Sequence, residues 1–214
     1  MNIMIFLWKK CSFIFLIALF VFGFFNSKLS LIGALCMILP LVISIFRGRY
    51  WCGNLCPRGS LYDNLLFAFS NHKQVPRVLK SEIIRYTIVV IMLSTFFKGI
   101  LSSKGDLFKI GMVFYKIIGI TTLIGILLTL LYNERAWCNI CPMGTLSNLI
   151  SQLNDNRKLL NVGTNCISCR ICSKKCPMGV APYTHKGKGI DNPDCIQCGR
   201  CRKACPQKCI TYKK

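Results

Sequence analysis

The C-terminal quarter of the chain carries one cysteine spacing twice: Cys166-x-x-Cys169-x-x-Cys172-x-x-x-Cys176-Pro177 and Cys195-x-x-Cys198-x-x-Cys201-x-x-x-Cys205-Pro206. Three thiolates within seven residues let a tight loop reach three corners of an iron–sulfur cube, and the fourth cysteine ligates the other cube in two-cluster proteins. The spacing therefore predicts two [4Fe–4S] clusters. Cluster 1 is expected to be held by Cys166, Cys169, Cys172 and Cys205, and cluster 2 by Cys195, Cys198, Cys201 and Cys176.

Other uses of these eight cysteines fit the pattern less well. Structural zinc usually takes its four ligands from two separated pairs. Disulfides require an oxidising compartment, which the predicted topology argues against. Cys209 is a ninth cysteine in this region, and its position just past Cys205-Pro206 favours packing beside a cluster over ligation.

Composition divides the chain into two parts. Its 214 residues are 53% hydrophobic and carry a net charge of +21, which is unusual for a soluble domain. The apolar residues are concentrated before about residue 133, whereas the C-terminal stretch is polar, basic and rich in Cys, Gly and Pro. We predict an all-α membrane domain over residues 1–156 and a small α+β domain over residues 157–214, similar to bacterial two-cluster ferredoxins.

Four segments are apolar enough to cross a bilayer, which takes about 20 residues. They cover residues 5–25, 29–47, 82–101 and 110–132. The first could instead be a cleaved signal peptide, but no small-x-small cleavage site follows Phe25, so a retained helix is expected.

Lys and Arg placement predicts the orientation of these spans. With the N-terminus inside, ten Lys and Arg fall on the inner side and four on the outer side. The predicted location is therefore the cytoplasmic membrane, as a multi-pass protein with the N-terminus and the cluster domain facing the cytoplasm.

An internal duplication follows the second and fourth spans. Loop 1 (residues 49–61) contains Trp51-Cys52-Gly-Asn-Leu-Cys56-Pro57, and loop 2 (residues 135–146) contains Trp137-Cys138-Asn-Ile-Cys141-Pro142. Two such units predict a parallel repeat about an axis along the membrane normal, which would bring the four loop cysteines together. They are either a third metal or iron–sulfur site or small thiols packed under a turn; this candidate set is Cys52, Cys56, Cys138 and Cys141.

Taken together, these features resemble the membrane polyferredoxins of the NapH type, which include the quinol dehydrogenase subunit of periplasmic nitrate reductase systems. The resemblance covers the chain from about residue 10 onward and rests on four spans, duplicated Cys-Pro loops and a two-cluster tail. It implies electron transfer between the membrane quinone pool and a redox partner. Loop 2 has two residues between its cysteines where that family commonly has three.

The tail's charge bears on its partners. Residues 157–214 hold thirteen Lys and Arg against Asp191 and Asp194. This charge could steer an acidic redox protein to the cytoplasmic face or bind an anionic inner leaflet. No recognition motif accompanies it, so nucleic acid is not an expected partner.

Two classes of function follow from the sequence. The first is an electron-transfer subunit of a membrane oxidoreductase, without catalytic residues of its own. The second is an accessory or sensory iron–sulfur protein for metal handling or redox-enzyme maturation. Only two histidines are present, His72 and His185, and neither lies in a predicted span, so a bis-histidine haem is not expected within the bilayer.

Overall fold

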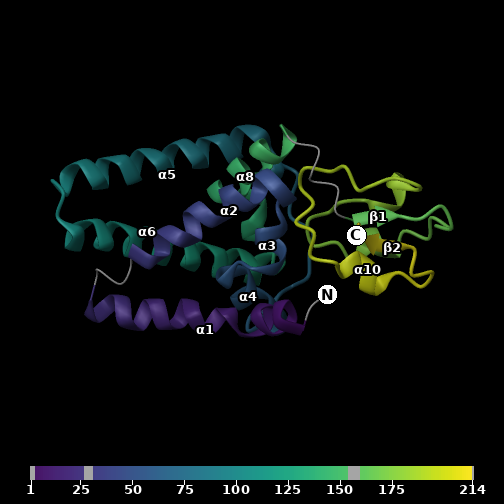
Figure 1. Cartoon of the computed structure of the whole chain (residues 1–214), viewed down its shortest axis with the longest axis horizontal. Helices are drawn as coiled ribbons and strands as arrows, with labels where there is room; N and C mark the ends of the chain where they lie inside the picture. Colours follow the sequence, from purple (N-terminus) through teal and green to yellow (C-terminus); the bar gives the residue numbers. More distant parts are fainter. Residues whose placement is uncertain (1–2, 27–30, 154–159, 214) are drawn as a thin grey trace.

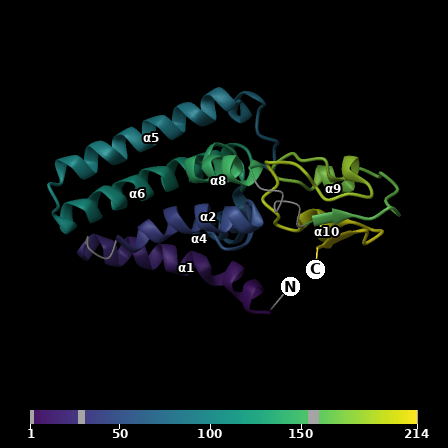
Figure 2. The same cartoon turned by 45° about the horizontal axis from the view of Figure 1, so that its top comes forward.

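The computed structural model describes residues 3–26, 31–153 and 160–213. Its long helices lie side by side along the longest axis, and the C-terminal tail packs at one end of them (Figure 1). The first described helix begins at the same end as the tail in both views (Figure 2). The helices therefore run away from the tail and back to it in two hairpins.

The four long helices are α1 (Ile3–Phe25), α2 (Gly33–Arg47), α5 (Glu82–Ser102) and α6 (Leu107–Leu131). Three helical stretches are long and apolar enough to cross a membrane unaided: Leu7–Phe25, Glu82–Ser102 and Leu107–Leu131. Many of their large apolar side chains are exposed, including Phe22, Val90 and Leu123. Such faces suit contact with lipid.

The second predicted span differs from the other three. Helix α2 has 15 residues and would cover about 22 Å at 1.5 Å per residue, less than the roughly 30 Å of a hydrocarbon core. It qualifies as a span only together with Tyr50–Asn64, which continues it after a bend of 113°. Within the described residues the structure thus gives three candidate spans, or four if this bent pair is one span. Of the segment predicted to begin at residue 29, residues 29–30 lie outside the described part.

Short helices fill the tail-facing end of the bundle. Loop 1 forms α3 (Tyr50–Asn54) and the start of α4 (Pro57–Asn64), and loop 2 forms α7 (Ala136–Ile140) and the start of α8 (Pro142–Gln152). Helix α4 packs along α1, and α8 packs against α2 and α5. Two 3-10 turns, η2 (Phe67–Phe69) and η3 (Val78–Lys80), precede α5.

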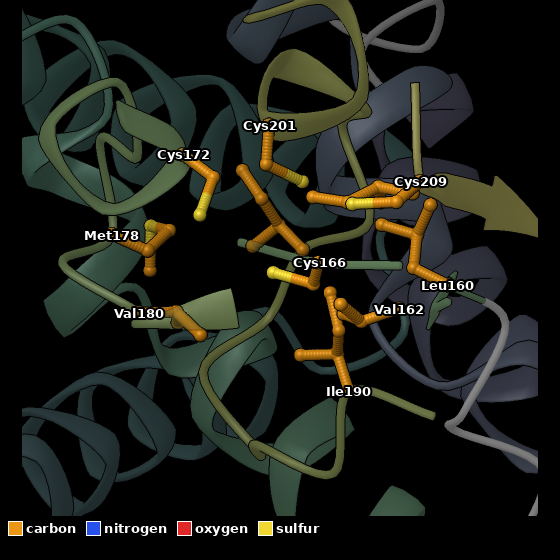
Figure 3. Packing of buried hydrophobic residues seen from close by; sticks show 11 residues of the cluster. Leu160, Val162, Cys166, Cys172, Met178, Val180, Ile190, Cys201 and Cys209 are labelled. Atoms are coloured by element: carbon orange, nitrogen blue, oxygen red, sulfur yellow. The ribbon is translucent and has the colours of Figure 1, made fainter. Parts of the chain in front are cut away.

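The tail is built around a two-stranded antiparallel sheet. Strand β1 (Leu160–Val162) pairs with β2 (Ile210–Tyr212), with Leu160 opposite Tyr212 and Val162 opposite Ile210. Between the strands lie α9 (Ile171–Lys174), η5 (Pro182–His185) and α10 (Arg200–Ala204). Apolar side chains and cysteines share one buried core (Figure 3). The described part of the tail thus combines short helices with this small sheet; the predicted domain boundary at residue 156 lies outside the described residues.

An ion-pair cluster fixes the tail against the helices. Arg85 donates to both carboxylate oxygens of Asp194, at 2.8 and 3.1 Å, and Arg49 lies 3.4 Å from the same carboxylate. Burial alone would raise the pKa of Asp194, but the hydrogen bond from Arg85 and the charge of Arg49 bring it below its ordinary value. Asp194 therefore stays ionised between two buried guanidinium groups.

Replacing Asp194 with asparagine should weaken this attachment. One charge is lost while two buried arginines remain, so the expected loss of stability is about 2–3 kcal/mol. The midpoint of thermal unfolding in detergent measures it. Glu82→Gln makes the same change of charge at an exposed position and should leave the midpoint nearly unchanged. Equal midpoints for the two variants would contradict the role given to Asp194.

Candidate iron–sulfur sites

The two cysteine motifs adopt the same backbone curl. The residue before the second cysteine has a positive φ in both copies, 55° at Ser168 and 55° at Gln197. The residue after it does so too, 62° at Arg170 and 74° at Gly199. Left-handed residues in such turns aim successive backbone N–H groups into a concavity that favours an anion, as in many iron–sulfur sites. Non-glycine residues hold this conformation only where the surroundings enforce it.

Each curl leads directly into a short helix. Arg170 and Gly199 are the N-cap residues of α9 and α10. The third cysteine of each motif, Cys172 or Cys201, is then buried within the first helical turn. Both helices end just before the Cys-Pro pair, because proline cannot continue them.

The tail cysteines line two separate small cavities, of about 10 and about 20 Å³. The first is lined by Cys166, Cys169, Cys172 and Cys205, and the second by Cys176, Cys195, Cys198 and Cys201. Each cavity thus combines three cysteines of one motif with the fourth of the other. Four thiols around a concave backbone fit a [4Fe–4S] cluster.

Cys209 also lines the first cavity. Its side chain is buried, and its sulfur lies 3.4 Å from that of Cys205. The sulfur therefore packs directly beside the fourth thiol of this cavity.

The thiols of the second cavity are poorly solvated. Burial raises the pKa of Cys195 to about 12 and also raises the pKa of Cys176. A cluster bound here would take thiolate ligands, so its assembly would displace protons from neutral thiols.

The two cavities face different surroundings. Around the second, Lys9 donates to the carbonyl of Cys198 at 3.4 Å, and Gln74 donates to that of Cys176 at 3.2 Å. Asn54 donates to the carbonyl of Gln197 at 3.1 Å. At the first cavity, by contrast, Cys169 is exposed and Ile167 is 62% exposed. The second site therefore borders the helices, and the first borders solvent.

The four loop cysteines line a single, larger cavity at the tail-facing end of the bundle. It has a volume of about 100 Å³, and its other walls are mostly apolar side chains of α1, α2 and α6. Cys52 and Cys138 also pack against the tail core. The structure thus brings the four residues of the duplication together. Within the described residues, no three His, Cys, Asp or Glu side chains are grouped closely enough for a single metal ion.

In the two duplicated loops, the arginine of each loop contacts the backbone of the other. Arg49 of loop 1 donates to the carbonyl of Cys138 at 2.6 Å, and Arg135 of loop 2 donates to that of Cys52 at 2.6 Å. Each guanidinium lies against a glycine of the other loop, where a Cβ at Gly59 or Gly144 would come within 3.0 Å of it. The arginine of each loop thus contacts the Trp-Cys pair and the Cys-Pro-x-Gly segment of the other loop.

Sequence reasoning missed the acidic partners of these arginines. Arg135 forms an ion pair with Asp63, which also accepts from Arg200 at 2.9 Å. Arg200 in turn pairs with Glu134. The arginines were counted as inner-side charges, but Arg49, Arg85 and Arg135 are buried in the fold. Arg49 and Arg135 each stand two residues before a Trp-Cys pair. This repetition was the sequence feature that could have indicated a structural role for these two arginines.

No disulfide joins any of the fifteen cysteines in the structure.

Comparisons with known proteins agree with an iron–sulfur assignment. Residues 29–76 and 116–159 match a family described as a 4Fe-4S binding domain, and residues 165–210 match a 4Fe-4S dicluster domain. These segments include both loops and all eight motif cysteines. No solved structure gives a significant match.

Three curated relatives are similar over much of the chain. Two are uncharacterized proteins of Methanocaldococcus jannaschii, MJ0749 and MJ0750, which are 24% and 27% identical over 67% of this chain. The third is the "Putative electron transport protein YccM" of Escherichia coli, 27% identical over 72% of this chain. The aligned region covers 57%, 65% and 51% of these relatives, so the chain spans between half and two thirds of their length. The chain is thus similar to a ferredoxin-type membrane protein that binds 4Fe–4S clusters through multiple cysteines.

Proposed function

We propose that this chain is a membrane-bound iron–sulfur protein that relays electrons between the quinone pool and a redox partner. The observation that carries this proposal is the pair of four-cysteine cavities, one against the helices and one toward solvent. A bound [4Fe–4S] cluster takes up and releases single electrons without any transfer of atoms. The similarity to YccM, whose name describes an electron transport protein, supports the same function.

The tail residues would set the order of the two sites. Cys195, Cys198, Cys201 and Cys176 would hold cluster 2 beside the helices, and Cys166, Cys169, Cys172 and Cys205 would hold cluster 1 beside solvent. The buried Arg49–Asp194–Arg85 contact would keep the inner site at a fixed distance from the bundle. The backbone of α3 packs closely on the inner motif, since a Cβ at Gly53 would lie 2.0 Å from the carbonyl oxygen of Ile196.

The large cavity at the loops is the candidate quinone site. Its helical part is lined by Leu16, Leu19, Ile117 and Ile118, and Phe15 at its rim is 41% exposed. Cavities lined mainly by apolar side chains, with a few polar groups, are typical of small-molecule sites. Reduction of a quinone to a quinol consumes two electrons and two protons, so the relay would deliver two electrons in succession.

Orientation and repeat symmetry belong to the same proposal. The bias of Lys and Arg toward one side favours a cytoplasmic location for the tail and the N-terminus, in the cell membrane. The reciprocal arginine contacts support two parallel repeats, with the tail as a separate domain from about residue 157.

The partner would dock on the basic face of the tail. The exposed basic residues of the described tail are Arg170, Lys174, Lys175, Lys186, Lys188, Arg202, Lys203, Lys208 and Lys213. Such a face favours an acidic protein and makes association depend on salt.

This docking predicts a salt effect on electron transfer to an acidic ferredoxin or flavodoxin. Raising ionic strength from about 0.01 to 0.5 M should slow the bimolecular rate at least about tenfold, because exposed charges are screened. Stopped-flow absorbance measures the rate, and the spectrum shows that the clusters stay intact. A rate indifferent to salt would contradict docking on the basic face.

Quinone coupling can be tested with the full chain in nanodiscs. Clusters reduced anaerobically with dithionite should be reoxidised when a short-chain quinone analogue is added, which restores their visible absorbance. Met37→Trp places a large ring at the cavity wall and should slow this reaction, whereas Ile38→Trp, at an exposed position of the same helix, should not. Loaded clusters that no quinone reoxidises would overturn the quinone part of the proposal.

A further inference from the structure

We propose that a basic hollow between α1 and the tail binds the phosphate headgroup of an anionic phospholipid. The hollow has a volume of about 740 Å³, within the roughly 300–1,000 Å³ that is typical of small-molecule sites. Its cationic wall residues are Lys9, Lys10, Arg202, Lys203 and Lys208. The first two belong to α1 and the others to the tail, so one bound headgroup would connect the tail to the first helix.

Carboxylates do not neutralise the positive charge of this hollow. Among the described residues, none of its five cationic side chains forms an ion pair. Asp63 also lines the hollow, but its carboxylate is already paired with Arg135 and Arg200. Lys9 is half-buried, and its ammonium group lies 3.4 Å from the carbonyl oxygen of Cys198. Positive charge of this kind in a concave site favours an anion.

Clusters in the tail would balance part of this charge. Cys198 and Cys205 also line the hollow, so bound clusters would place negative charge behind its cations. Lys10 and Lys203, however, are exposed. Their ammonium groups therefore remain available to a ligand that enters from outside the protein.

An exposed apolar stripe continues from the hollow along α1. Ile14, Ile17 and Val21 follow Lys10 at helical spacing, which places the four residues on one face of the helix. The three apolar side chains are 56%, 44% and 50% exposed. They belong to the candidate span Leu7–Phe25. An acyl chain attached to a headgroup in the hollow would therefore lie along this stripe.

The neighbouring charge and apolar stripe favour a phospholipid over a free anion or an acidic protein. A free anion would use the cations and leave the stripe uncovered. Lys9 and Lys10 lie near the tail-facing end of the candidate span, where basic side chains meet lipid headgroups. An acidic redox protein still has a surface to dock on, because six exposed basic residues of the tail do not line the hollow: Arg170, Lys174, Lys175, Lys186, Lys188 and Lys213.

Native mass spectrometry of the full chain in a nonionic detergent tests this inference. The probes are dioleoyl phosphatidylglycerol, which is anionic, and dioleoyl phosphatidylcholine, which has the same acyl chains and no net charge. One phosphatidylglycerol per chain should be retained at concentrations at least about tenfold below those that phosphatidylcholine needs. Equal retention of the two lipids would overturn the inference.

A matched pair of double variants separates the hollow from the overall charge. Lys10→Gln/Lys203→Gln removes two exposed charges of the hollow and should weaken phosphatidylglycerol binding at least about tenfold. Lys186→Gln/Lys188→Gln removes the same charge from exposed tail positions outside the hollow and should change binding by less than about twofold. The visible absorbance of the clusters checks that both variants are folded. Equal weakening by the two variants would show unspecific attraction and contradict a site in the hollow.

Competition with glycerol phosphate distinguishes the lipid from its headgroup alone. This anion carries the phosphate without acyl chains, so it should not displace phosphatidylglycerol when the two are at equal concentration. Displacement under that condition would assign the hollow to small anions and overturn the role of the stripe. Unchanged lipid binding by Lys10→Gln/Lys203→Gln, together with slower electron transfer to an acidic ferredoxin, would assign the hollow to the protein partner instead.

Discussion

Cys195→Ala is expected to remove the cluster beside the helices and to disconnect the outer cluster from quinone. About four irons per chain should be lost, because the thiol belongs to one cube. The remaining cluster should still be reduced by dithionite, but its reoxidation by a quinone analogue should fall to the rate of an uncoupled control. The reason is the order of the cavities, in which Cys195 lies at the membrane-facing site.

Cys169→Ala is the matched control for that order. Cys169 is exposed and lines the outer cavity. This variant should also lose about four irons, yet keep quinone-dependent reoxidation of the inner cluster while delivery to a soluble partner fails. Iron analysis together with stopped-flow absorbance separates the two variants. The same loss of quinone coupling in both would contradict the order of the sites.

Gly53→Ala is expected to be strongly destabilising. Its Cβ would lie 2.0 Å from the carbonyl oxygen of Ile196 and 3.0 Å from the backbone nitrogen of Cys198. Both are backbone atoms of the inner cysteine motif, so neither can move without displacing the tail. We expect a loss of about 3 kcal/mol in stability, together with slower quinone-dependent reoxidation.

The same substitution at Gly119 provides the control. A Cβ there meets only Phe20, at an ordinary distance of 3.7 Å. Because alanine is a better helix former than glycine, Gly119→Ala should raise stability by up to about 1 kcal/mol. Thermal unfolding in detergent measures both variants. Tolerance of alanine at Gly53 would mean that the tail does not pack on α3 as described.

Cysteine spacing made the tail predictable. Each motif is local, with three cysteines in seven residues, and the local backbone forms the curl and the short helix that follow. The grouping of Cys205 with the first motif, and of Cys176 with the second, also followed from the pattern. The ligand sets themselves stay predictions until metal analysis.

Hydropathy predicted where the long helices lie but not which of them is too short to span a bilayer alone. The segment from residue 29 to 47 is apolar throughout, yet the helix within it begins at Gly33 and contains Pro40. Its length falls short of a bilayer because the chain bends by 113° into loop 1. Apolar composition alone does not distinguish a full span from such a bent pair.

The contacts between tail and helices could not be read from the sequence. Arg85 and Asp194 are 109 residues apart, and Asp63 and Arg135 are 72 apart. No local pattern links such positions, and each charge taken alone fits a residue at the membrane surface. Their pairing appears only when the tail is docked, which is why the acidic partners were missed.

Iron and sulfide chemistry gives the most direct test of the central claim, that the tail thiols cage iron–sulfur clusters. Full chain prepared without oxygen should contain at least eight irons and eight acid-labile sulfides, with broad brown absorbance that dithionite bleaches. Protein that folds and binds no labile sulfide, or that carries zinc in place of iron, would contradict it.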